Sequence, residues 1–362
     1  MEIIKLNQKN CQQTAKHAAE VLKKGGLVIF PTETVYGIGA DATNQQAILK
    51  LLSYKSRREG KPLSIAVTDQ LMAEQFVELN EQAKNLYQRF LPGPYTIVSR
   101  YKNGLADGVA SEFNTLGVRI PDHKLALDIV RNLKQPITAT SANASGKKRP
   151  YAVTDILKNL SNKQKALIDL IIDAGELPPN EPSVVIDTTL STPLTLRSSG
   201  SPQDKSSKKS IKLISHSEKE TQEIAGKLLL KHWDQLTQQG LIIGLDGELG
   251  AGKTVFAKGV GNFLRISSTI TSPTYSYIRE YDFTRYQTEG KLFHIDVWKV
   301  DDPQVLEKLQ IPALLAPNHL IVIEWWTQLK DSLAQFQANL NVRLELISEN
   351  ERSLTIIENP SS

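Results

Sequence analysis

The chain is 362 residues long, which at ~150 residues per domain indicates two domains. Its hydrophobic content of 40% and charged content of 23% exclude a disordered, collagen-like or coiled-coil protein. The net charge of +4 is too small to indicate a dedicated nucleic-acid binder, although a local basic face stays open.

The single cysteine, Cys11, excludes an intramolecular disulfide and a multi-cysteine zinc site. The histidines show no metal-type spacing. The first residues lack the basic start and long apolar core of a signal peptide. No apolar run approaches the ~20 residues that span a bilayer. We therefore expect a cytoplasmic protein that does not enter a membrane.

Helix and strand patterns alternate through the first half of the chain. Apolar residues at helical spacing are followed by the Gly25–Gly26 pair, which ends the first helix. The patterns predict helices around residues 15–22 and 48–52 and strands at residues 27–30, 63–67 and 116–120. This order is typical of an α/β or α+β unit with a mixed sheet.

A segment without large apolar residues divides the chain. Residues 198–210 are SSGSPQDKSSKKS, and such a segment cannot bury enough surface to offset its ordering entropy. It is typical of a flexible linker, although a long surface loop inside one domain has the same composition. Because complete patterns resume on both sides, we expect domains over residues 1–197 and 211–362.

The second half has the element order of a nucleotide-binding α/β sheet. A helix is predicted around residues 219–233, and a buried strand follows at 241–245. A glycine-rich loop then leads into a helix from about Lys253. Two more strands are predicted, at residues 291–297 and 319–324.

The glycine-rich loop, GELGAGKT at residues 247–254, fits G-x-x-x-x-G-K-[ST] at every fixed position. In such a loop backbone N–H groups converge on phosphate oxygens, and the next helix adds its positive N-terminal end. Lys253 is expected to reach the β- and γ-phosphates, and Thr254 to place its hydroxyl on Mg²⁺. The loop follows a strand and opens a helix, which favours a nucleotide site over a plain glycine turn. The expected nucleotide contacts are Glu248, Leu249, Gly250, Ala251, Gly252, Lys253, Thr254 and Val255.

Two carboxylates follow apolar strands of the second half. Asp296 comes after Phe293-His294-Ile295, and Glu324 after residues 320–323. A carboxylate at this place suits Mg²⁺ binding or the positioning of water. From spacing alone, ordinary strand-end acids that face solvent are an equal alternative.

The second half resembles the TsaE family, a small bacterial ATPase of tRNA threonylcarbamoyladenosine synthesis. Four motifs occur in the order of the family: GELGAGKTVF (247–256), TSPTY (271–275), HIDVW (294–298) and IEW (323–325). The resemblance implies a P-loop NTPase fold and a nucleotide-sensing loop at residues 272–275. It also implies catalytic roles for Lys253, Asp296 and Glu324, with Glu324 near Mg²⁺ beside Thr254 and Trp325 beside the site. The family usually has Leu-Tyr at residues 297–298.

Four polar segments of the first half are candidates for a second site. They are PTETVYG (31–37), KSRREGKP (55–62), GVRIP (117–121) and TATSANASG (138–146). The cations of the second segment suit a triphosphate, and Arg119 in an apolar strand needs a carboxylate or phosphate partner if it is buried. Each segment alone also fits a structural role: a capped turn, a solvated basic loop, a solvent-facing arginine and a plain polar loop.

Together these segments resemble the YrdC-like family of threonylcarbamoyl-AMP synthases, the TsaC family. Matching pieces are residues 26–43, 55–63, 92–96 (PGPYT), 117–121, 141–146 and 182–187 (PSVVID). Leu196-Arg197 with Gly200 is a weaker match, because one extra serine separates the arginine from the glycine. Ala66 stands where longer members have histidine, which places the domain with the short form.

This resemblance implies a twisted mixed sheet with helices and the synthesis of threonylcarbamoyl-AMP and pyrophosphate from L-threonine, bicarbonate and ATP, with Mg²⁺ on the phosphates. Lys55 and Arg57 are implied as catalytic. Implied L-threonine contacts are Thr34, Arg119, Ser141 and Ser183. Implied nucleotide contacts are Lys55, Arg57, Lys61, Thr96, Asn143 and Arg197.

Neither half resembles the last enzyme of that pathway. The adenylate is therefore expected to pass to the TsaD transferase with its partner TsaB, and tRNA to be reached only through them. The second half is expected to dock on the transferase and to reset it by ATP hydrolysis. Two other classes stay open: a non-catalytic RNA-binding or docking protein with a regulatory nucleotide switch, and an enzyme whose P-loop half is a small-molecule kinase.

Overall fold

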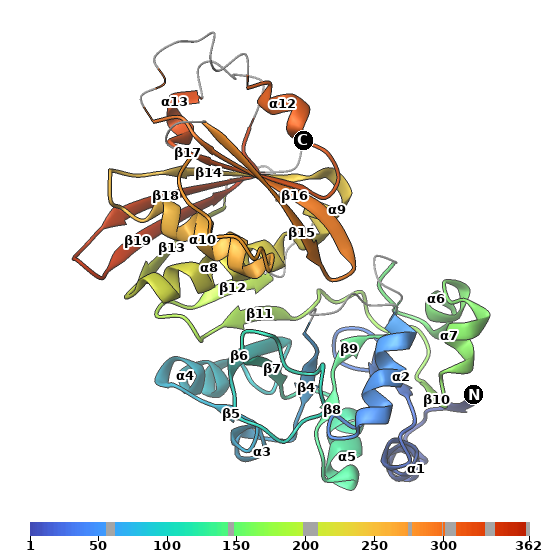
Figure 1. Ribbon diagram of the computed structural model, residues 1–362. Helices are drawn as coiled ribbons and strands as arrows, with labels where there is room; N and C mark the ends of the chain where they lie inside the picture. Colours follow the sequence, from blue (N-terminus) through green and yellow to red (C-terminus); the bar gives the residue numbers. More distant parts are fainter. Residues whose placement is uncertain are drawn as a thin grey trace. The chain divides into compact units, whose positions relative to one another are not determined.

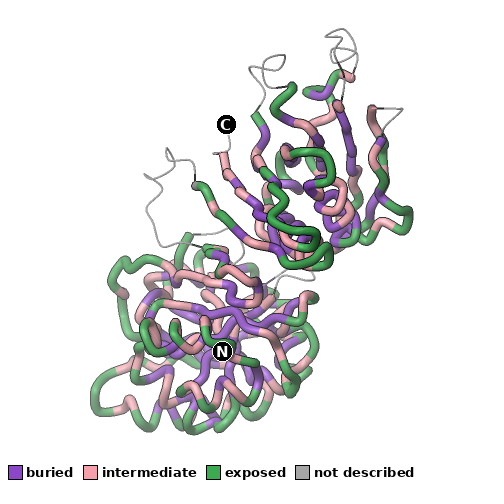
Figure 2. The backbone as a smooth tube through the Cα atoms, turned by 90° about the vertical axis from the view of Figure 1, so that its left-hand side faces the viewer, coloured by how far each residue is buried: buried purple, intermediate pink, exposed green. Residues whose placement is uncertain are grey.

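The computed structural model describes residues 1–55, 62–143, 148–197, 209–273, 277–298, 300, 309–329 and 337–359. The chain divides into two compact units (Figure 1). The first comprises Met1–Thr189 with Thr195–Gly200, and the second Leu190–Leu194 with Ser201–Ser362. Buried residues, purple in Figure 2, run through the interior of each unit.

The helices of the first unit are amphipathic. In α1 the residues expected at helical spacing, Ala15, Ala18, Ala19 and Leu22, are all buried. The helices are α1 (Cys11–Lys23), α2 (Gln45–Lys55), α3 (Gln70–Glu74), α4 (Glu81–Phe90), α5 (Lys124–Leu133), α6 (Val153–Lys158) and α7 (Asn162–Ala166).

One sheet of the first unit has five strands. Their order is β1 (Glu2–Lys5), β10 (Leu170–Asp173), β2 (Val28–Phe30), β3 (Gly37–Gly39) and β9 (Thr140–Ser141). The strands β1, β10 and β2 are parallel, whereas β2, β3 and β9 are antiparallel. Because β3 pairs with β9, Gly37 at the end of PTETVYG lies opposite Ser141 of the TATSANASG segment.

The other sheet places candidate residues at one edge. Its order is β12 (Leu194–Arg197), β11 (Val184–Asp187), β6 (Tyr95–Tyr101), β7 (Thr115–Arg119), β4 (Ser64–Ala66) and β8 (Ile137–Thr138), and β5 (Val77–Glu78) pairs with β6. Strand β11 is parallel to β6, and β7 is antiparallel to β6. The start of β6, the start of β11 and the end of β7 therefore lie at the same edge.

A shared core joins the two sheets of the first unit. One hydrophobic cluster includes Ile38 of the five-stranded sheet, Ile97 and Val118 of the other sheet, and Leu51 of α2. A second cluster packs α1 and α5 against β2 and β10. The elements that bear the polar segments are thus fixed to one hydrophobic interior.

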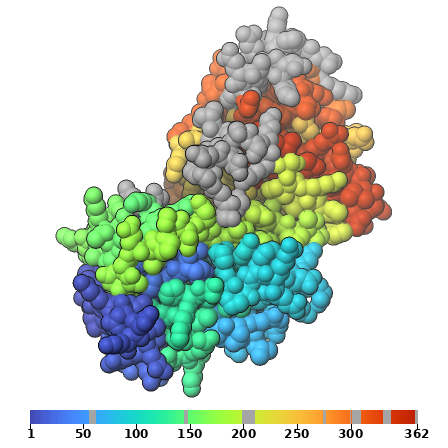
Figure 3. Space-filling view, turned by 180° about the vertical axis from the view of Figure 1, so that it is seen from behind, coloured from blue at the N-terminus to red at the C-terminus, as the bar shows by residue number. Residues whose placement is uncertain are grey.

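The second unit is built on one seven-stranded sheet. Its order is β13 (Lys209–Ser215), β19 (Arg352–Glu358), β18 (Leu340–Leu346), β14 (Leu241–Asp246), β17 (His319–Glu324), β16 (Thr288–Asp296) and β15 (Ile278–Arg285). The start and end of the unit pair through β13 and β19, yellow-green and red in Figure 3. Its described helices are α8 (Glu218–Lys231), α9 (Trp233–Gln239), α10 (Lys253–Phe263), α12 (Ile311–Leu314) and α13 (Trp326–Leu329).

The parallel strands of this sheet bring the sequence motifs to one edge. Strand β14 is parallel to β17 and β18, and β16 is parallel to β17. The glycine-rich loop follows β14 directly, Glu324 ends β17 and Asp296 ends β16. Asp296 and Glu324 are register partners, so the two carboxylates stand on adjacent strands beside the loop.

The mixed α/β class is confirmed, with three differences from the sequence expectations. The strands of the first unit form two sheets, which short apolar runs do not reveal. The helix predicted over residues 219–233 is divided at His232 into α8 and α9. The expected linker ended too late, because Lys209 and Ser210 already pair with β19; residues 198–208 lie outside the described residues.

No helix within the part of the chain that the structure describes is long and apolar enough to cross a membrane.

The pairing of Glu358 with Lys231 links β19 to the end of α8. The Lys231 Nζ lies 2.6 Å from Glu358 Oε1, and the two side chains are only 19% and 17% exposed. Burial raises the pKa of Glu358, but hydrogen bonds and charges from His232 and Lys231 outweigh it and bring the pKa down to about 2. A folded-state pKa below the unfolded one stabilises the fold above pH ~5, and that stability is lost as the pH falls toward ~2.

We expect Glu358→Gln to lower the free energy of unfolding of the second unit at pH 7 by about 2–3 kcal/mol. The variant should also lose most of the wild-type pH dependence between pH 5 and 2. Tryptophan fluorescence in urea reports on this unit, because all four tryptophans lie in the second half of the chain. Glu280→Gln, in a half-exposed pair with Lys291, is the control. Equal pH slopes for wild type and Glu358→Gln would contradict this assignment.

Candidate functional sites

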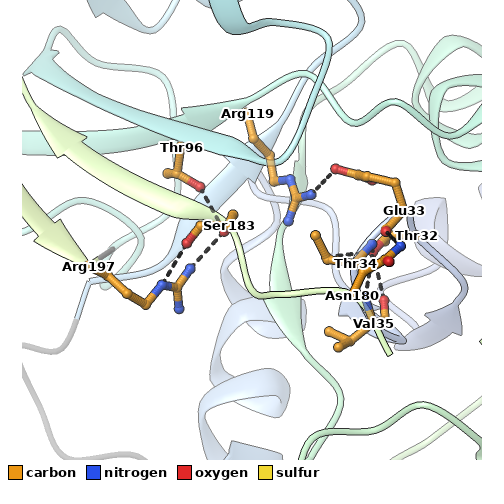
Figure 4. Close-up of polar contacts among 9 residues, drawn as sticks. All are labelled: Thr32, Glu33, Thr34, Val35, Thr96, Arg119, Asn180, Ser183 and Arg197. Atoms are coloured by element: carbon orange, nitrogen blue, oxygen red, sulfur yellow. Dashed lines mark hydrogen bonds and ion pairs between the residues drawn. The ribbon is translucent and has the colours of Figure 1, made fainter. Parts of the chain in front are cut away.

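The arginine at the end of β7 is buried against a carboxylate. Arg119 Nη2 donates to Glu33 Oε1, and the two side chains are only 11% and 15% exposed (Figure 4). Glu33 belongs to the PTETVYG segment after β2, and the Asn180 side chain donates to its backbone carbonyl at 2.8 Å. The alternative of a solvent-facing arginine is therefore wrong, and Arg119 has the carboxylate partner that burial demands.

A second arginine approaches the same edge from β12. Arg197 donates from Nε to the Ser183 carbonyl at 2.8 Å and from Nη2 to the Ser183 hydroxyl at 2.7 Å (Figure 4). Thr96 Oγ1 lies 3.5 Å from Ser183 Oγ. Burial lowers the pKa of Arg197, and the charges of Arg119 and Arg149 lower it further. Three guanidinium groups thus act on one region, which favours an anionic ligand.

The threonines of the PTETVYG segment have different roles. The Thr32 hydroxyl accepts from the backbone of Thr34 and Val35 and donates to the Val35 carbonyl at 2.7 Å. It therefore caps the turn, as the structural alternative for this segment expected. The Thr34 side chain is buried, with its hydroxyl 3.1 Å from that of Thr32.

Lys55 at the end of α2 contacts the TATSANASG segment. Its ammonium donates to the carbonyl oxygens of Ser141 at 2.8 Å and Asn143 at 2.7 Å, and the side chain is buried. The Ser141 hydroxyl donates to Asn143 Oδ1 at 2.6 Å. The structure thus brings these three expected residues together. Arg57 and Lys61 lie outside the described residues.

The glycine-rich loop of the second unit depends on glycine at two positions. Gly247 has φ +143°, and a Cβ there would lie 2.3 Å from the Leu344 carbonyl oxygen. Gly252 has φ +104°, and a Cβ there would lie 2.6 Å from Nη1 of Arg352. Any side chain at either position would distort the loop that opens α10.

Lys253 folds back onto this loop. Its ammonium donates to the carbonyl oxygens of Gly247 at 2.8 Å and Glu248 at 2.9 Å. It also lies 3.7 Å from the centre of the Trp325 ring, against which the Trp298 ring packs at 4.1 Å. Burial lowers the pKa of Lys253, although nearby carboxylates raise it. The cation is thus held beside the loop, and Trp325 stands where the resemblance placed it.

The two strand-end carboxylates are buried, so the alternative of solvent-facing acids is wrong. Glu324 accepts a hydrogen bond from the Thr254 hydroxyl at 2.9 Å, and its Oε1 lies 2.9 Å from Nε2 of the fully buried His294. Asp296 accepts hydrogen bonds from the Ser272 hydroxyl and from the Trp298 backbone N–H. These contacts fix both carboxylates beside the loop.

The residues at this edge fit Mg²⁺. The Thr254 hydroxyl and the Glu324 carboxylate are hard oxygen donors within hydrogen-bond distance of each other. Among the described residues, no cluster of three or more His, Cys, Asp or Glu side chains makes a complete metal cage. Mg²⁺ commonly takes one or two protein oxygens and completes its shell with phosphates and water, which matches this donor set.

Sequence reasoning missed two partners. Glu33 belongs to the PTETVYG motif, but its pairing with Arg119 could not be predicted, because the two residues are 86 positions apart in the sequence. His294 was also in a quoted motif, and the only signal for it was its place two residues before Asp296 on the same strand, which puts both side chains on one face.

Two family models match the chain. Residues 20–199 match Sua5_yciO_yrdC, which is described as "Telomere recombination". Residues 215–354 match TsaE, described as "Threonylcarbamoyl adenosine biosynthesis protein TsaE". Both resemblances drawn from the motifs are confirmed.

Curated relatives match about half of the chain. A putative threonylcarbamoyl-AMP synthase of Methanocaldococcus jannaschii is 40% identical over 190 residues, which are 51% of this chain and 86% of the relative. A threonylcarbamoyl-AMP synthase of Pyrococcus abyssi is 35% identical over 55% of this chain, and one of Bacillus subtilis is 36% identical over 51% of it. The chain spans only 58% and 52% of the lengths of these two.

Solved structures agree with the fold. A double-alanine variant of P. abyssi Sua5 is similar with a TM-score of 0.52 and 28% identity, covering 73% of this chain and 74% of that one. P. abyssi Sua5 complexed with L-threonine has a TM-score of 0.52 and 22% identity, covering 89% of this chain and 92% of that one, which shows the fold alone. The chain therefore belongs to the Sua5/YciO/YrdC family of enzymes through its N-terminal half, and its residues 215–354 match the TsaE family model.

Proposed function

We propose that the N-terminal unit makes threonylcarbamoyl-AMP and pyrophosphate from L-threonine, bicarbonate and ATP. We further propose that the C-terminal unit hydrolyses ATP in support of the TsaD/TsaB transferase of tRNA threonylcarbamoyladenosine synthesis. The observation that supports the first proposal most is the largely buried Arg119–Glu33 pair at a sheet edge, together with Arg197, on which the charges of Arg119 and Arg149 act. The names of the curated relatives describe the same activity.

The reaction needs positioning more than covalent help from the protein. The threonine amine adds to carbon dioxide to give a carbamate, and a carbamate oxygen attacks the α-phosphate of ATP as pyrophosphate leaves. Arg119 would bind the threonine carboxylate, with Thr34, Ser141 and Ser183 as further contacts. The nucleotide contacts would be Lys55, Arg57, Lys61, Thr96, Asn143 and Arg197. Alignment of the two substrates and neutralisation of charge supply the rate.

The second proposal is supported by the loop and its neighbours. Residues 248–255 would surround the phosphates, and Lys253 would exchange the two loop carbonyls for phosphate oxygens. When bound by Thr254 and Glu324, Mg²⁺ supplies charge neutralisation on the phosphates. His294 would hold Glu324 in place, and Asp296 would position water or a metal-bound ligand.

The fusion would place these two activities on one polypeptide. The transferase would receive the adenylate from the first unit while the second unit acts on the transferase. Covalent linkage raises the effective concentration of one unit at any partner bound by the other. On this proposal tRNA is reached through TsaD and TsaB, and the protein works in the cytoplasm.

We expect the full chain to release pyrophosphate from ATP only when both L-threonine and bicarbonate are present. Arg197→Gln should lower kcat/KM by about 100-fold, because it removes charge and the two contacts that fix Ser183. Arg131→Gln, a half-exposed arginine of the same unit, is the control. Pyrophosphate release that does not depend on threonine would refute the synthase and favour a docking protein.

ATP binding should change the tryptophan fluorescence of the chain, because the phosphates would draw Lys253 away from the Trp325 ring. In Lys253→Ala, ATP should no longer change the tryptophan fluorescence. The variant should also hydrolyse ATP about 100-fold more slowly or worse. Lys291→Ala, which removes a surface lysine of the same unit, should retain both. Phosphate transfer to an added metabolite rather than to water would instead indicate a kinase.

A further inference from the structure

Three buried polar atoms around the Arg119–Glu33 pair have no hydrogen-bond partner among the described residues. They are Glu33 Oε2, Arg119 Nε and His123 Nδ1. Burial lowers the pKa of His123, and the negative charges of Glu33 and Asp122 offset part of this shift. His123 precedes α5 and does not cap it with its side chain.

Unpaired atoms of this kind are costly to bury. The Arg119–Glu33 ion pair uses Nη2 of the arginine and Oε1 of the carboxylate. The Nε–H donor of Arg119 and the Oε2 acceptor of Glu33 therefore have no partner within the pair. A ligand that satisfies both must offer an acceptor to the arginine and a donor to the glutamate.

The backbone around Glu33 fixes it in this place. Thr32 caps the turn on one side of it, and the Asn180 side chain binds the Glu33 carbonyl. Figure 4 shows the Glu33 carboxylate and the Arg119 guanidinium facing each other, each from a different segment of the chain. The backbone contacts thus hold the turn at Glu33, and the hydrogen bond from Arg119 orients its carboxylate.

An α-amino acid is a ligand of the required chemistry. Its carboxylate accepts from a guanidinium, and its ammonium donates to a carboxylate through a short, charge-assisted hydrogen bond. Neither a phosphate nor a nucleobase carries a cationic donor next to an anionic acceptor. The left-over atoms therefore favour the amino-acid substrate over the nucleotide at this pair.

We propose that Glu33 binds the α-ammonium of the amino-acid substrate through Oε2, so that Glu33 and Arg119 together recognise the two charged ends of one molecule. This inference rests on the proposed synthase function and adds a residue that determines substrate specificity. Glu33 then also fixes the direction in which the nitrogen lies before the ammonium loses a proton to solvent and the resulting amine adds to carbon dioxide. Glutamine at this position would still accept a hydrogen bond from Arg119 through its amide oxygen and would lose the charge that recognises the ammonium.

The test compares two ligands on two forms of the full chain. L-threonine carries the ammonium, whereas 3-hydroxybutyrate keeps the carboxylate and the hydroxyl group and lacks the nitrogen. We expect Glu33→Gln to weaken L-threonine binding, measured by calorimetry, by about 10- to 100-fold. Binding of 3-hydroxybutyrate should change by less than about 2-fold, since its contacts do not include the glutamate charge.

Equal weakening of both ligands would overturn the proposal, because Glu33 would then act only by placing Arg119. Unchanged binding of both would overturn it as well. Glu33→Asp keeps the charge on a shorter side chain and should restore part of the preference for L-threonine. Glu81→Gln, in an exposed pair with Lys84, controls for the loss of a carboxylate. A far-UV circular dichroism spectrum and a thermal unfolding profile that match wild type confirm that the variants fold.

The proposed synthase function and the role of Glu33 can be refuted separately. If the wild-type chain binds no L-threonine and shows no threonine-dependent pyrophosphate release, the proposed synthase function fails and the role of Glu33 fails with it. If the wild type does both and Glu33→Gln retains the full preference for L-threonine over 3-hydroxybutyrate, only the role of Glu33 is refuted.

Discussion

A charged side chain that is removed from solvent must find a partner, and both units of this protein meet that need inside their candidate sites. In the first unit Arg119 pairs with Glu33. In the second, Lys253 binds carbonyl oxygens of its own loop, and Glu324 lies between Thr254 and a buried histidine. Such contacts hold the charged groups in position and can be exchanged for a ligand that offers the same chemistry.

On the proposed function, the two sites would bind phosphates in different ways. The second unit would use backbone N–H groups, a helix N-terminus and one lysine, all within a short segment that needs glycine at two positions. The first unit instead gathers guanidinium groups from separate strands and loops at a sheet edge. A loop of fixed sequence suits the same nucleotide in many proteins, whereas a site assembled from distant segments can also be shaped around a second substrate. This difference agrees with an ATPase in one unit and a two-substrate synthase in the other.

The sequence predicted what short-range rules determine. The spacing of G-x-x-x-x-G-K-T and the strand before it were sufficient to predict the loop, and apolar runs ending in Asp296 and Glu324 were sufficient to predict the strand ends. The partner of Arg119 was not predictable, because it depends on the pairing of segments 86 residues apart. The division of the first unit into two sheets was missed for the same reason, since strands that mostly have two to five residues do not reveal their neighbours. Ser210 was assigned to the linker because a serine and lysine run looks the same in a linker and in an edge strand.

The most direct measurement is a crystal structure of the full chain with L-threonine and an ATP analogue that cannot be cleaved between the α- and β-phosphates. We expect the threonine carboxylate within hydrogen-bond distance of the Arg119 guanidinium and the analogue's phosphates near Arg197. In the second unit the Lys253 ammonium should have left the carbonyls of Gly247 and Glu248 for phosphate oxygens. A structure in which both ligands bind while Arg119 and Lys253 keep only their present partners would contradict the account.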